Sequence, residues 1–345
     1  METELPTLCR PTVWLEGDEV VMLDRRRFPE ERTYVRLKSP EEVAKAIEDM
    51  VIQGAGSIGL AAGYGVLLAI KRAAKKSRED LLRYVEAAGH RLIATRPTGR
   101  HIREIVEMLL NEVRRALQEG RDPFEPASRA LSAEEERMRR AAELCGKNAA
   151  SLLEDGDTIL VHCFPGCALI YMLLEAKRSG KEIKVFCTET RPYLQGARLT
   201  ATTLMEMGVR PTLITDGMTA YCLWRGLIDK VFVAADRIAL DGSIANKVGT
   251  YAIALAAFHS GVPFYVLGYE GPDPTTKRGI DIPIEERDPS ELFSIRGVRI
   301  APDGVGGYYP ALDVTPPEFI SAIVTDKGIY PPRLIWRYLS DPKSQ

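Results

Sequence analysis

The feature that most constrains the fold is an alternation of short β-rich runs with amphipathic helical segments, which begins at Glu154. Three of the helical segments end in glycine, at Gly180, Gly208 and Gly261, as helices commonly do. Strands that alternate with helices favour a parallel sheet covered on both faces. The pattern therefore predicts a Rossmann-like, doubly wound α/β fold. The five strands and the helices between them are TILVHC, ALIYMLLEAKRSG, KVFCTE, GARLTATTLMEMG, PTLITD, AYCLWRG, KVFVAADRI, TYAIALAAFHSG and PFYVLG.

The first part of the chain has a different character. Apolar and polar residues alternate around a Glu-Gly-Asp turn, which predicts a β-hairpin over residues 13–23. The run SPEE at residues 39–42 is typical of a helix N-terminus, and several segments with helical spacing of apolar residues follow it. Because one core rarely serves more than roughly 250 residues, we expect two domains: an N-terminal β-hairpin and helical domain (1–150) and a Rossmann-like α/β catalytic domain (151–345). In the proline-rich tail, PPEFISAIVTDKG predicts a short helix.

The composition argues against several classes of partner. Of the 345 residues, 45% are hydrophobic and 27% are charged, and the formal net charge is −2, so neither nucleic acid nor a membrane is expected to bind. No run approaches the roughly 18 uninterrupted apolar residues of a membrane span. The first residues are acidic and broken by prolines, unlike a secretion signal. We therefore expect a cytoplasmic protein.

The cysteines show no spacing typical of a metal site or a redox pair, and the chain has only four histidines. A zinc site is therefore not expected, and reduced thiols are the natural expectation for a cytoplasmic chain. The six cysteines lie at positions 9, 145, 163, 167, 187 and 222.

Polar side chains follow each of the first four predicted strands. His162 and Cys163 follow the first strand, residues 188–191 the second, Asp216 the third and Asp236 the fourth. In a doubly wound sheet the ligand lies outside the carboxyl ends of the strands, near the point where the strand order reverses. We therefore expect these polar strand ends to share one pocket.

Two of these residues are candidates for catalysis, and each has a plain structural alternative. Cys163 precedes Phe-Pro-Gly-Cys and a helix, whose N–H groups would lower the pKa of the thiol and favour a thiolate or a bound anion. A lone strand-end cysteine more often just fills a core, and Cys167, inside the next helix, is expected to pack. Asp236 follows a run of apolar residues, so it is either the cap of a turn or a carboxyl in a dry site with a raised pKa, ready to act as an acid.

Further polar residues are candidates for ligand binding. Asn246 and Lys247 precede a helix and would offer an amide and an ammonium group to a polar ligand, although a turn also explains them. Gln195 lies between Arg191 and Arg198 in a loop that suits an anionic sugar or a phosphate. Arg191 is equally suited to a structural pair with a neighbouring carboxylate.

The first domain holds a second group of candidates. The turn QGAGSIG begins with Gln53, Gly54 and Ala55 and precedes a helix, so its backbone permits the close approach of a ligand. The spacing of its glycines is neither that of a phosphate-binding Walker loop nor that of a dinucleotide fingerprint. Arg96, in ATRPTGR, is a further candidate phosphate ligand.

Taken together, these segments resemble the family of S-methyl-5-thioribose-1-phosphate isomerases. That family shares its fold with archaeal ribose-1,5-bisphosphate isomerases and with regulatory subunits of the eukaryotic initiation-factor exchange factor. The resemblance covers nearly the whole chain. The segments that carry it are the hairpin, DMVIQGAGSIGLAAGYGV, ATRPT, ETRPYLQGARLTA, TLITDGMTAY, AADRIALDGSIANKVGTYAIALAAFHSGVPFYV, IPIEER and DVTPPEFISAIVTDKG.

The resemblance implies an isomerase that needs no metal or organic cofactor and converts an aldose 1-phosphate into the ketose 1-phosphate. It assigns catalysis to Cys163 and Asp236, with the cysteine acting at C2 and the aspartate as an acid. It also suggests a homo-oligomer, at least a dimer. The substrate-binding residues that the resemblance implies are Gln53, Gly54, Ala55, Arg96, Gln195, Asn246 and Lys247.

Three departures from the family pattern leave the substrate open. Gln53 stands where the family usually has arginine, Phe164-Pro165 follows the cysteine in place of asparagine and a small residue, and YPALD (309–313) replaces Asn-Pro-Ala-Phe-Asp. One hypothesis is methylthioribose-1-phosphate isomerase, in methionine salvage. Another keeps the chemistry on 5-deoxyribose 1-phosphate, ribose 1,5-bisphosphate or another pentose 1-phosphate. The last is a non-catalytic regulatory subunit, which would have no need of both Cys163 and Asp236.

Overall fold

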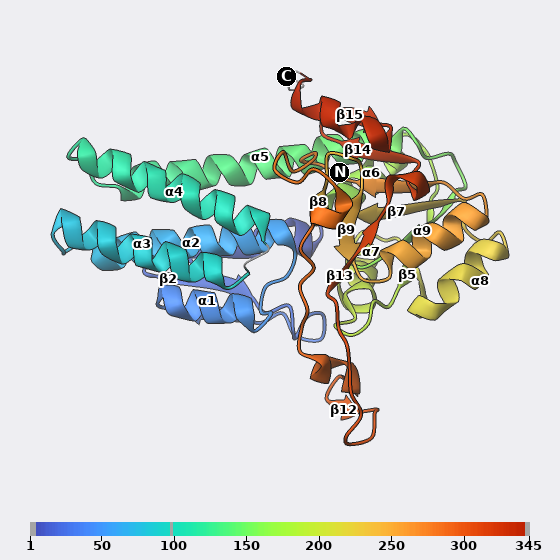
Figure 1. Cartoon of the computed structure of the whole chain (residues 1–345), viewed down its shortest axis with the longest axis horizontal. Helices are drawn as coiled ribbons and strands as arrows, with labels where there is room; N and C mark the ends of the chain where they lie inside the picture. The colour runs from blue at the N-terminus through green and yellow to red at the C-terminus, as the bar shows by residue number, and fades with distance from the viewer. Residues whose placement is uncertain (1–4, 97–98, 342–345) are drawn as a thin grey trace. The chain divides into compact units, whose positions relative to one another are not determined.

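The computed structural model describes residues 5–96 and 99–341 of the chain (Figure 1). Contacts divide the chain into a helical unit, Arg10–Arg139, and a sheet unit, which comprises Met1–Cys9 and Arg140–Gln345. The division falls inside one long helix, and the expected boundary at residue 150 coincides with the end of this helix. Within the described part of the chain, no helix is long and apolar enough to cross a membrane.

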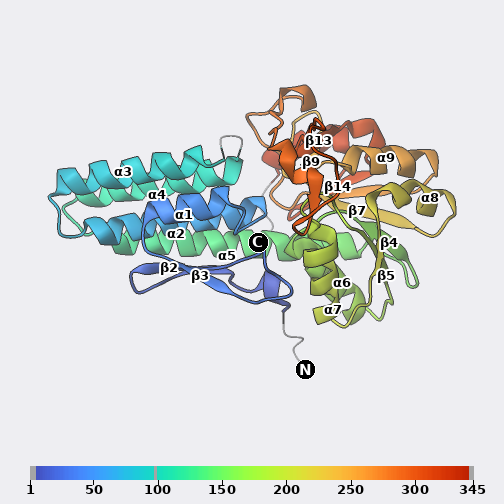
Figure 2. The same ribbon diagram turned by 90° about the horizontal axis from the view of Figure 1, so that it is seen from below.

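The helical unit begins with the predicted hairpin. Val13 pairs with Met22 across an antiparallel hairpin, which confirms the expected alternation, and a further strand pairs with the second. The strands are β1 (Val13–Glu16), β2 (Glu19–Leu23) and β3 (Tyr34–Leu37). The helices are α1 (Pro40–Glu48), α2 (Ala55–Ala73), α3 (Arg78–Ala94), α4 (Arg100–Gln118) and α5 (Phe124–Ala150). Figure 2 shows the small sheet on the opposite side of α1 and α2 from α3, and the aliphatic residues between these layers form one core.

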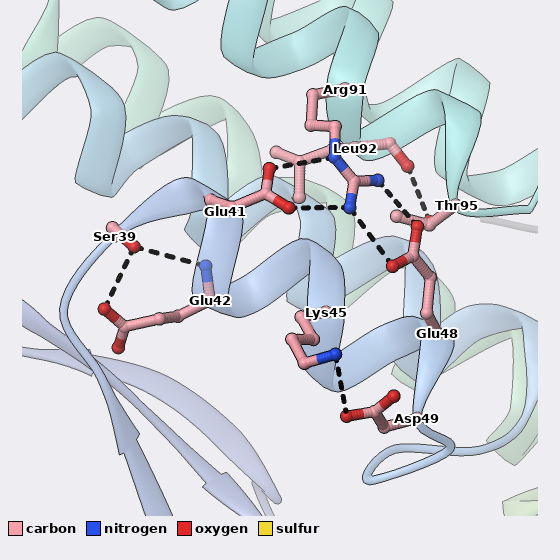
Figure 3. A network of polar contacts seen from close by, with 9 residues as sticks. All are labelled: Ser39, Glu41, Glu42, Lys45, Glu48, Asp49, Arg91, Leu92 and Thr95. Atoms are coloured by element: carbon pink, nitrogen blue, oxygen red, sulfur yellow. Dashed lines mark hydrogen bonds and ion pairs between the residues drawn. The ribbon is translucent and has the colours of Figure 1, made fainter.

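Helix α1 is fixed at both ends by polar contacts (Figure 3). Ser39 caps its first turn by accepting a 3.2 Å hydrogen bond from the N–H of Glu42, as the SPEE run predicts. The guanidinium of Arg91, on α3, donates to Glu41 at 2.8 Å and to Glu48 at 2.7 Å. These hydrogen bonds hold the pKa of Glu48 below its usual range. Arg91 therefore ties α1 to α3 just before the loop that carries Gln53.

The sheet unit contains a seven-stranded sheet with the order β15-β14-β10-β7-β4-β5-β6. All neighbouring pairs are parallel except β14 and β15, so the expectation of a mixed α/β protein with a mostly parallel sheet is confirmed. The strands are β4 (Thr158–Val161), β5 (Lys184–Thr188), β6 (Thr212–Ile214), β7 (Lys230–Ala234), β10 (Phe264–Leu267), β14 (Ala322–Thr325) and β15 (Gly328–Tyr330).

The order of these strands creates a switch point. From β4 the chain proceeds outward to β5 and β6, and then returns to place β7 on the other side of β4. Val161 of β4 lies beside Phe232 of β7. The carboxyl ends of β4 and β7 are therefore neighbours at the point where the sheet reverses direction, which is where ligands bind in such sheets.

Helices cover this sheet, and the sheet unit also contains two smaller, separate sheets. The helices are α6 (Cys167–Arg178), α7 (Ala201–Glu206), α8 (Thr219–Trp224) and α9 (Thr250–His259), and Gly196–Thr200 forms a π-helical turn before α7. A three-stranded antiparallel sheet contains β8 (Arg237–Ile238), β9 (Ile244–Lys247) and β13 (Leu312–Thr315), and β11 (Ser294–Ile295) pairs with β12 (Val298–Arg299).

The tail differs from the sequence-based expectation. The prediction of a short helix over PPEFISAIVTDKG is wrong. Only Pro317–Phe319 is helical in this segment, and β14 follows it. Ile323 and Val324 are fully buried in the sheet core between β10 and β15. Burial on both sides of a central strand explains why an apolar β-branched run here adopts strand geometry.

Candidate active site

Cys163 lies directly beyond the end of β4, in an unusual backbone conformation. Its φ is 61°, and Thr190, beyond the neighbouring strand β5, has a φ of 63°. Such left-handed conformations cost energy in non-glycine residues and gather at functional sites. The carbonyl of Cys163 accepts a hydrogen bond from the hydroxyl of Thr200. The strand end is thus held by side chains from the following loop and helix.

His162 braces this strand end rather than facing a ligand. The ring is buried, with Nδ1 2.7 Å from Thr188 Oγ1 and Nε2 3.0 Å from the carbonyl of Val248. Because a carbonyl only accepts, Nε2 donates to Val248, and Nδ1 accepts from the Thr188 hydroxyl. Burial lowers the pKa of His162, so the ring is neutral. Gly249 leaves the room for this ring, since a Cβ there would lie 3.3 Å from it.

The Cys163 thiol is protonated at neutral pH in this state of the protein. Burial raises its pKa to about 11, while Lys247 and the N–H of Phe164 act in the opposite direction. The expectation of a pKa lowered by a helix start is therefore wrong. Helix α6 begins only at Cys167, after Gly166, and the desolvation of the thiol outweighs the nearby positive charge.

Asp236 follows β7 at the switch point, beside the strand that carries Cys163. Its N–H donates a 2.9 Å hydrogen bond to the carbonyl of Ala245. The negative charge of Asp236 raises the pKa of Cys163. It also raises the pKa of Lys247, whereas burial lowers the pKa of that residue. Asp236 is exposed, so the dry setting expected from the apolar run before it is absent.

Asn246 and Lys247 lie on strand β9 and not in a turn. Both are buried, and the amide of Asn246 donates a 3.0 Å hydrogen bond to Thr250 Oγ1. Burial lowers the pKa of Lys247, and the nearby Cys163 and Asp236 oppose that shift. The sheet unit therefore brings together three predicted site residues, Cys163, Asp236 and Lys247, and Asn246 precedes Lys247 on β9.

The loop after β5 is held mainly by structural contacts. Asp216 accepts hydrogen bonds of 2.8 Å from the N–H groups of both Thr190 and Arg191. The guanidinium of Arg191 donates to the carbonyls of Leu292 and Ser294, at 3.0 and 3.2 Å. Asp216 and Arg191 thus shape the loop, and neither is directed at a ligand by these contacts.

Gln195 and Arg198 differ in this loop. Arg198 donates a 3.0 Å hydrogen bond to the carbonyl of Tyr193. Gln195 is only 5% exposed, and its Oε1 atom makes no hydrogen bond with any described residue. A buried oxygen without a partner is costly unless water or a ligand satisfies it. Gln195 is therefore the better ligand candidate of the two.

The helical unit brings its own candidates together around Met50. The amide of Gln53 donates to the carbonyl of Met50 at 3.3 Å, and the guanidinium of Arg96 contacts the Met50 sulfur at 2.8 Å and the carbonyl of Ile47 at 3.0 Å. Gly54, with a φ of 89°, precedes Ala55, the first residue of α2. The helix start, Gln53 and Arg96 therefore lie close together. Pro97 and Thr98 of the ATRPTGR motif lie outside the described residues.

Arg25 is a residue of this group that the sequence did not reveal. Its guanidinium donates to the carbonyl of Gln53, to Ser57 Oγ at 3.0 Å and to Thr12 Oγ1 at 3.1 Å. A Cβ on Gly54 would lie 3.8 Å from its NH1 atom. Burial lowers its pKa to about 10, so it stays charged at neutral pH. A fixed positive charge thus lies against the turn that starts α2.

The cysteines depart from expectation at two positions. Cys9 and Cys167 form a disulfide, with their Cα atoms 5.7 Å apart, so the expectation of reduced thiols and of simple packing by Cys167 is wrong for this pair. Close to Cys9 in the chain, the N–H and the hydroxyl of Thr7 donate hydrogen bonds to Glu206, at 2.7 and 2.9 Å.

Among the described residues, no three His, Cys, Asp or Glu side chains are grouped so as to hold a metal ion.

Comparison with known protein families gives a match over most of the chain. The model of the initiation factor 2 subunit family matches residues 51–332. Among curated proteins, the methylthioribose-1-phosphate isomerase of Thermotoga maritima is 41% identical over 335 residues, covering 93% of this chain and 95% of that protein. The enzyme of the same name from Thermus thermophilus is 42% identical over 325 residues, covering 90% of this chain and 91% of its own.

Solved structures show the same similarity. The 5-methylthioribose 1-phosphate isomerase of Pyrococcus horikoshii matches with a TM-score of 0.80 and 34% identity, over 98% of this chain and 96% of that one. The structure described as translation initiation factor eIF-2B, subunit delta, from A. fulgidus matches with a TM-score of 0.80 and 33% identity, over 95% and 97%. The chain therefore belongs to the initiation factor 2 subunit family, and its relatives there include methylthioribose-1-phosphate isomerases.

Proposed function

We propose that the protein is an aldose–ketose isomerase that converts S-methyl-5-thioribose 1-phosphate into S-methyl-5-thioribulose 1-phosphate, a step of methionine salvage. One observation carries the proposal for this chain. Cys163 and Asp236 follow β4 and β7, the two neighbouring strands at the switch point of the sheet. A thiol and a carboxyl group at that place suit proton transfer on a small polar substrate. The similarity to isomerases of this name supports the choice of substrate.

The chemistry assigns a separate task to each of the two residues. The phosphate on C1 prevents spontaneous ring opening, so the enzyme has to break the bond between C1 and the ring oxygen. Asp236, in its protonated form, gives its proton to that oxygen, which becomes the C4 hydroxyl. The hydrogen on C2 then moves to C1, as a proton or as a hydride, while the C2 hydroxyl loses its proton to Asp236. Cys163 takes or guides the hydrogen at C2.

Lys247 and Asn246 support these steps. The ammonium group of Lys247 favours the thiolate form of Cys163, against the burial that disfavours it. Asn246 and Gln195 offer amide groups to the sugar hydroxyls. All three side chains are buried, so their hydrogen bonds to a substrate would form in an environment of low dielectric, where such bonds are strong.

In the helical unit, we assign phosphate binding to Gln53, Gly54, Ala55 and Arg96. The backbone N–H groups at the start of α2 favour an anion, and Gly54 allows it to come close. The neutral Gln53 supplies no charge at a position where the family usually has arginine. Arg25 places a cation against the same turn, which offsets the missing charge.

Two other functions stay as alternatives to be tested. The departures at Gln53, Phe164-Pro165 and Tyr309 favour the same chemistry on another sugar: 5-deoxyribose 1-phosphate, ribose 1,5-bisphosphate or another pentose 1-phosphate. The similarity to an initiation-factor subunit favours a non-catalytic regulatory role. We also propose a cytoplasmic homo-oligomer, a dimer or larger, which light scattering of the purified protein would test.

A panel of aldose 1-phosphates separates these functions. Each sugar phosphate is incubated with the purified protein, and ketose formation is followed. The highest kcat/KM with methylthioribose 1-phosphate would support the lead proposal, and preference for another member would replace its substrate. Binding of a sugar phosphate without turnover of any member would favour the regulatory role.

A further inference from the structure

The sheet unit contains a group of buried polar atoms whose hydrogen bonds are missing. Each of these atoms is buried and has no hydrogen-bond partner among the described residues. Proteins rarely leave such atoms unsatisfied, and a group of them indicates bound water or a ligand. Three such atoms lie on neighbouring side chains: Arg287 NH1, Glu291 Oε2 and the Tyr309 hydroxyl.

The side chains that carry these atoms are held in place by their other contacts. Arg287 donates to Glu285 at 3.1 Å, and its guanidinium lies 5.8 Å from the ring centre of Tyr193. The hydroxyl of Tyr193 donates a hydrogen bond to Glu291 Oε1, the other oxygen of this carboxylate. The N–H of Arg287 donates a 2.9 Å hydrogen bond to the carbonyl of Tyr309, so these two residues lie side by side. We name Arg287, Glu291 and Tyr309 the polar subsite.

The polar subsite adjoins the candidate catalytic residues. The ring centre of Tyr309 lies 6.0 Å from Lys247 Nζ, and Tyr309 is only 3% exposed. Ionisation of Cys163 would raise the pKa of Tyr309, and the charge of Arg287 lowers the pKa of Lys247, as expected for neighbouring groups. The polar subsite therefore lies beside Cys163 and Lys247.

The kinds of atom in the polar subsite indicate the kind of ligand. Arg287 NH1 donates, the Tyr309 hydroxyl both donates and accepts, and the Glu291 carboxylate accepts. A phosphate needs donors and is repelled by a carboxylate, and a methylthio group needs neither donors nor acceptors. A pair of sugar hydroxyls uses both, because each hydroxyl donates one hydrogen bond and accepts others.

We propose that the polar subsite binds the C3–C4 diol of the open-chain sugar, which rests on the proposed function. The C4 hydroxyl exists only after the ring has opened, since its oxygen is the ring oxygen of the aldose. The subsite therefore favours the open-chain form, which is the form that isomerises. Tyr309 is a substrate-binding residue in this proposal, and the assignment holds whatever group the sugar carries at C5.

The test uses an open-chain probe and a matched pair of tyrosine variants. The probe is the pentitol 1-phosphate made by reducing the ketose product, and its binding is measured by calorimetry. Tyr309→Phe removes one buried hydroxyl and keeps the ring. Tyr308→Phe is the control, because Tyr308 is exposed and its hydroxyl donates a 3.1 Å hydrogen bond to Glu286. We expect Tyr309→Phe to weaken binding by roughly three- to tenfold, as for one lost hydrogen bond, and Tyr308→Phe to change it less than twofold.

A second probe, the 3,4-dideoxy analogue, separates a direct contact from a change in the fold. We expect Tyr309→Phe and the wild type to bind this analogue equally, because no diol remains to be lost. Equal binding of the first probe by Tyr309→Phe and the wild type would overturn the inference, and so would an equal loss with both probes. If the wild type neither isomerises any aldose 1-phosphate nor binds the pentitol phosphate, the proposed function fails. Normal turnover with unchanged binding by Tyr309→Phe would reject the polar subsite alone.

Discussion

The main-chain N–H of Cys163 donates a 3.0 Å hydrogen bond to Thr190 Oγ1, across the ends of two neighbouring strands. The bond belongs to a directed chain. Thr190 Oγ1 lies 3.1 Å from Thr188 Oγ1, which lies 2.7 Å from His162 Nδ1. Because the histidine nitrogen accepts, each hydroxyl donates toward it and accepts from the group before it. Two adjacent residues, His162 and Cys163, are thus joined through Thr188, at the end of β5, and Thr190, just beyond it.

Thr190→Val should break this chain with little change in shape. The N–H of Cys163 would lose its acceptor, and we expect the free energy of unfolding to fall by about 1–3 kcal/mol. We also expect kcat to fall about tenfold with KM nearly unchanged, because the position of the thiol changes and the substrate contacts do not. The control is Thr212→Val, at an exposed position of β6, which should alter neither value. An unchanged kcat in Thr190→Val would contradict the role of this hydrogen bond.

Cys163→Ala and Asp236→Asn should each reduce kcat by about 100-fold or more, as expected for the loss of an acid or base. Steady-state kinetics with the best substrate of the panel measures this, and thermal unfolding shows whether each variant stays folded. Cys222→Ala, in α8, is the matched control and should keep its activity within about threefold. Activity within threefold of the wild type in either catalytic variant would reject the mechanism.

Lys247→Met tests the charge beside the thiol. The pKa of Cys163 is raised to about 11 by burial, and Lys247 partly opposes the shift. Only the thiolate reacts with iodoacetamide, so alkylation of Cys163 should become faster as the pH rises from 7 to 10. Without the ammonium group the pKa of Cys163 rises further, and we expect slower alkylation, with the largest difference near pH 7, where Lys247 of the wild type is charged. Mass spectrometry of the Cys163 peptide measures the rate, with exposed Lys277→Met as the control. Equal rates in Lys247→Met and the wild type would show that the ammonium does not support the thiolate.

The charge of Arg25 can be moved to test its role. Arg25→Gln should raise KM for the sugar phosphate by roughly 10-fold or more, with kcat changed less than threefold, because a charged donor near the phosphate is lost. The double variant Arg25→Gln with Gln53→Arg restores one cation at the turn and should recover most of the affinity. Arg26→Gln, which removes the half-exposed arginine of the ion pair with Asp24, is the control. A double variant no better than Arg25→Gln would rule out a role for the charge itself.

The sequence predicts which segments form strands better than it predicts which strands lie side by side. Five β-rich runs alternate with helices, and each becomes a parallel strand, because the pattern is local. The local sequence does not indicate that β7 pairs with β4. Only the structure therefore shows that the strands that precede Cys163 and Asp236 are neighbours. The strands β14 and β15 escape prediction because prolines interrupt the tail and its apolar run is short.

The candidate site shows the same limit. Residue type and position at strand ends suffice to propose Cys163 and Asp236, but not to foresee that desolvation raises the pKa of the thiol and that the carboxyl is exposed. Arg25 lies 28 residues before Gln53, and nothing in the run DRRRFP marks one arginine as buried. Tyr309 differs from the family pattern, yet only the structure shows that its hydroxyl lacks a partner.

The disulfide between Cys9 and Cys167 gives the chain a covalent topology of its own. The two cysteines are 158 positions apart, and the whole helical unit, Arg10–Arg139, lies between them. The backbone from Cys9 to Cys167 is therefore a closed ring, and the part of the sheet unit that follows Cys167 is a tail attached to it. A protease that cuts the helical unit once would open this ring without releasing a fragment, and both halves would separate only after reduction.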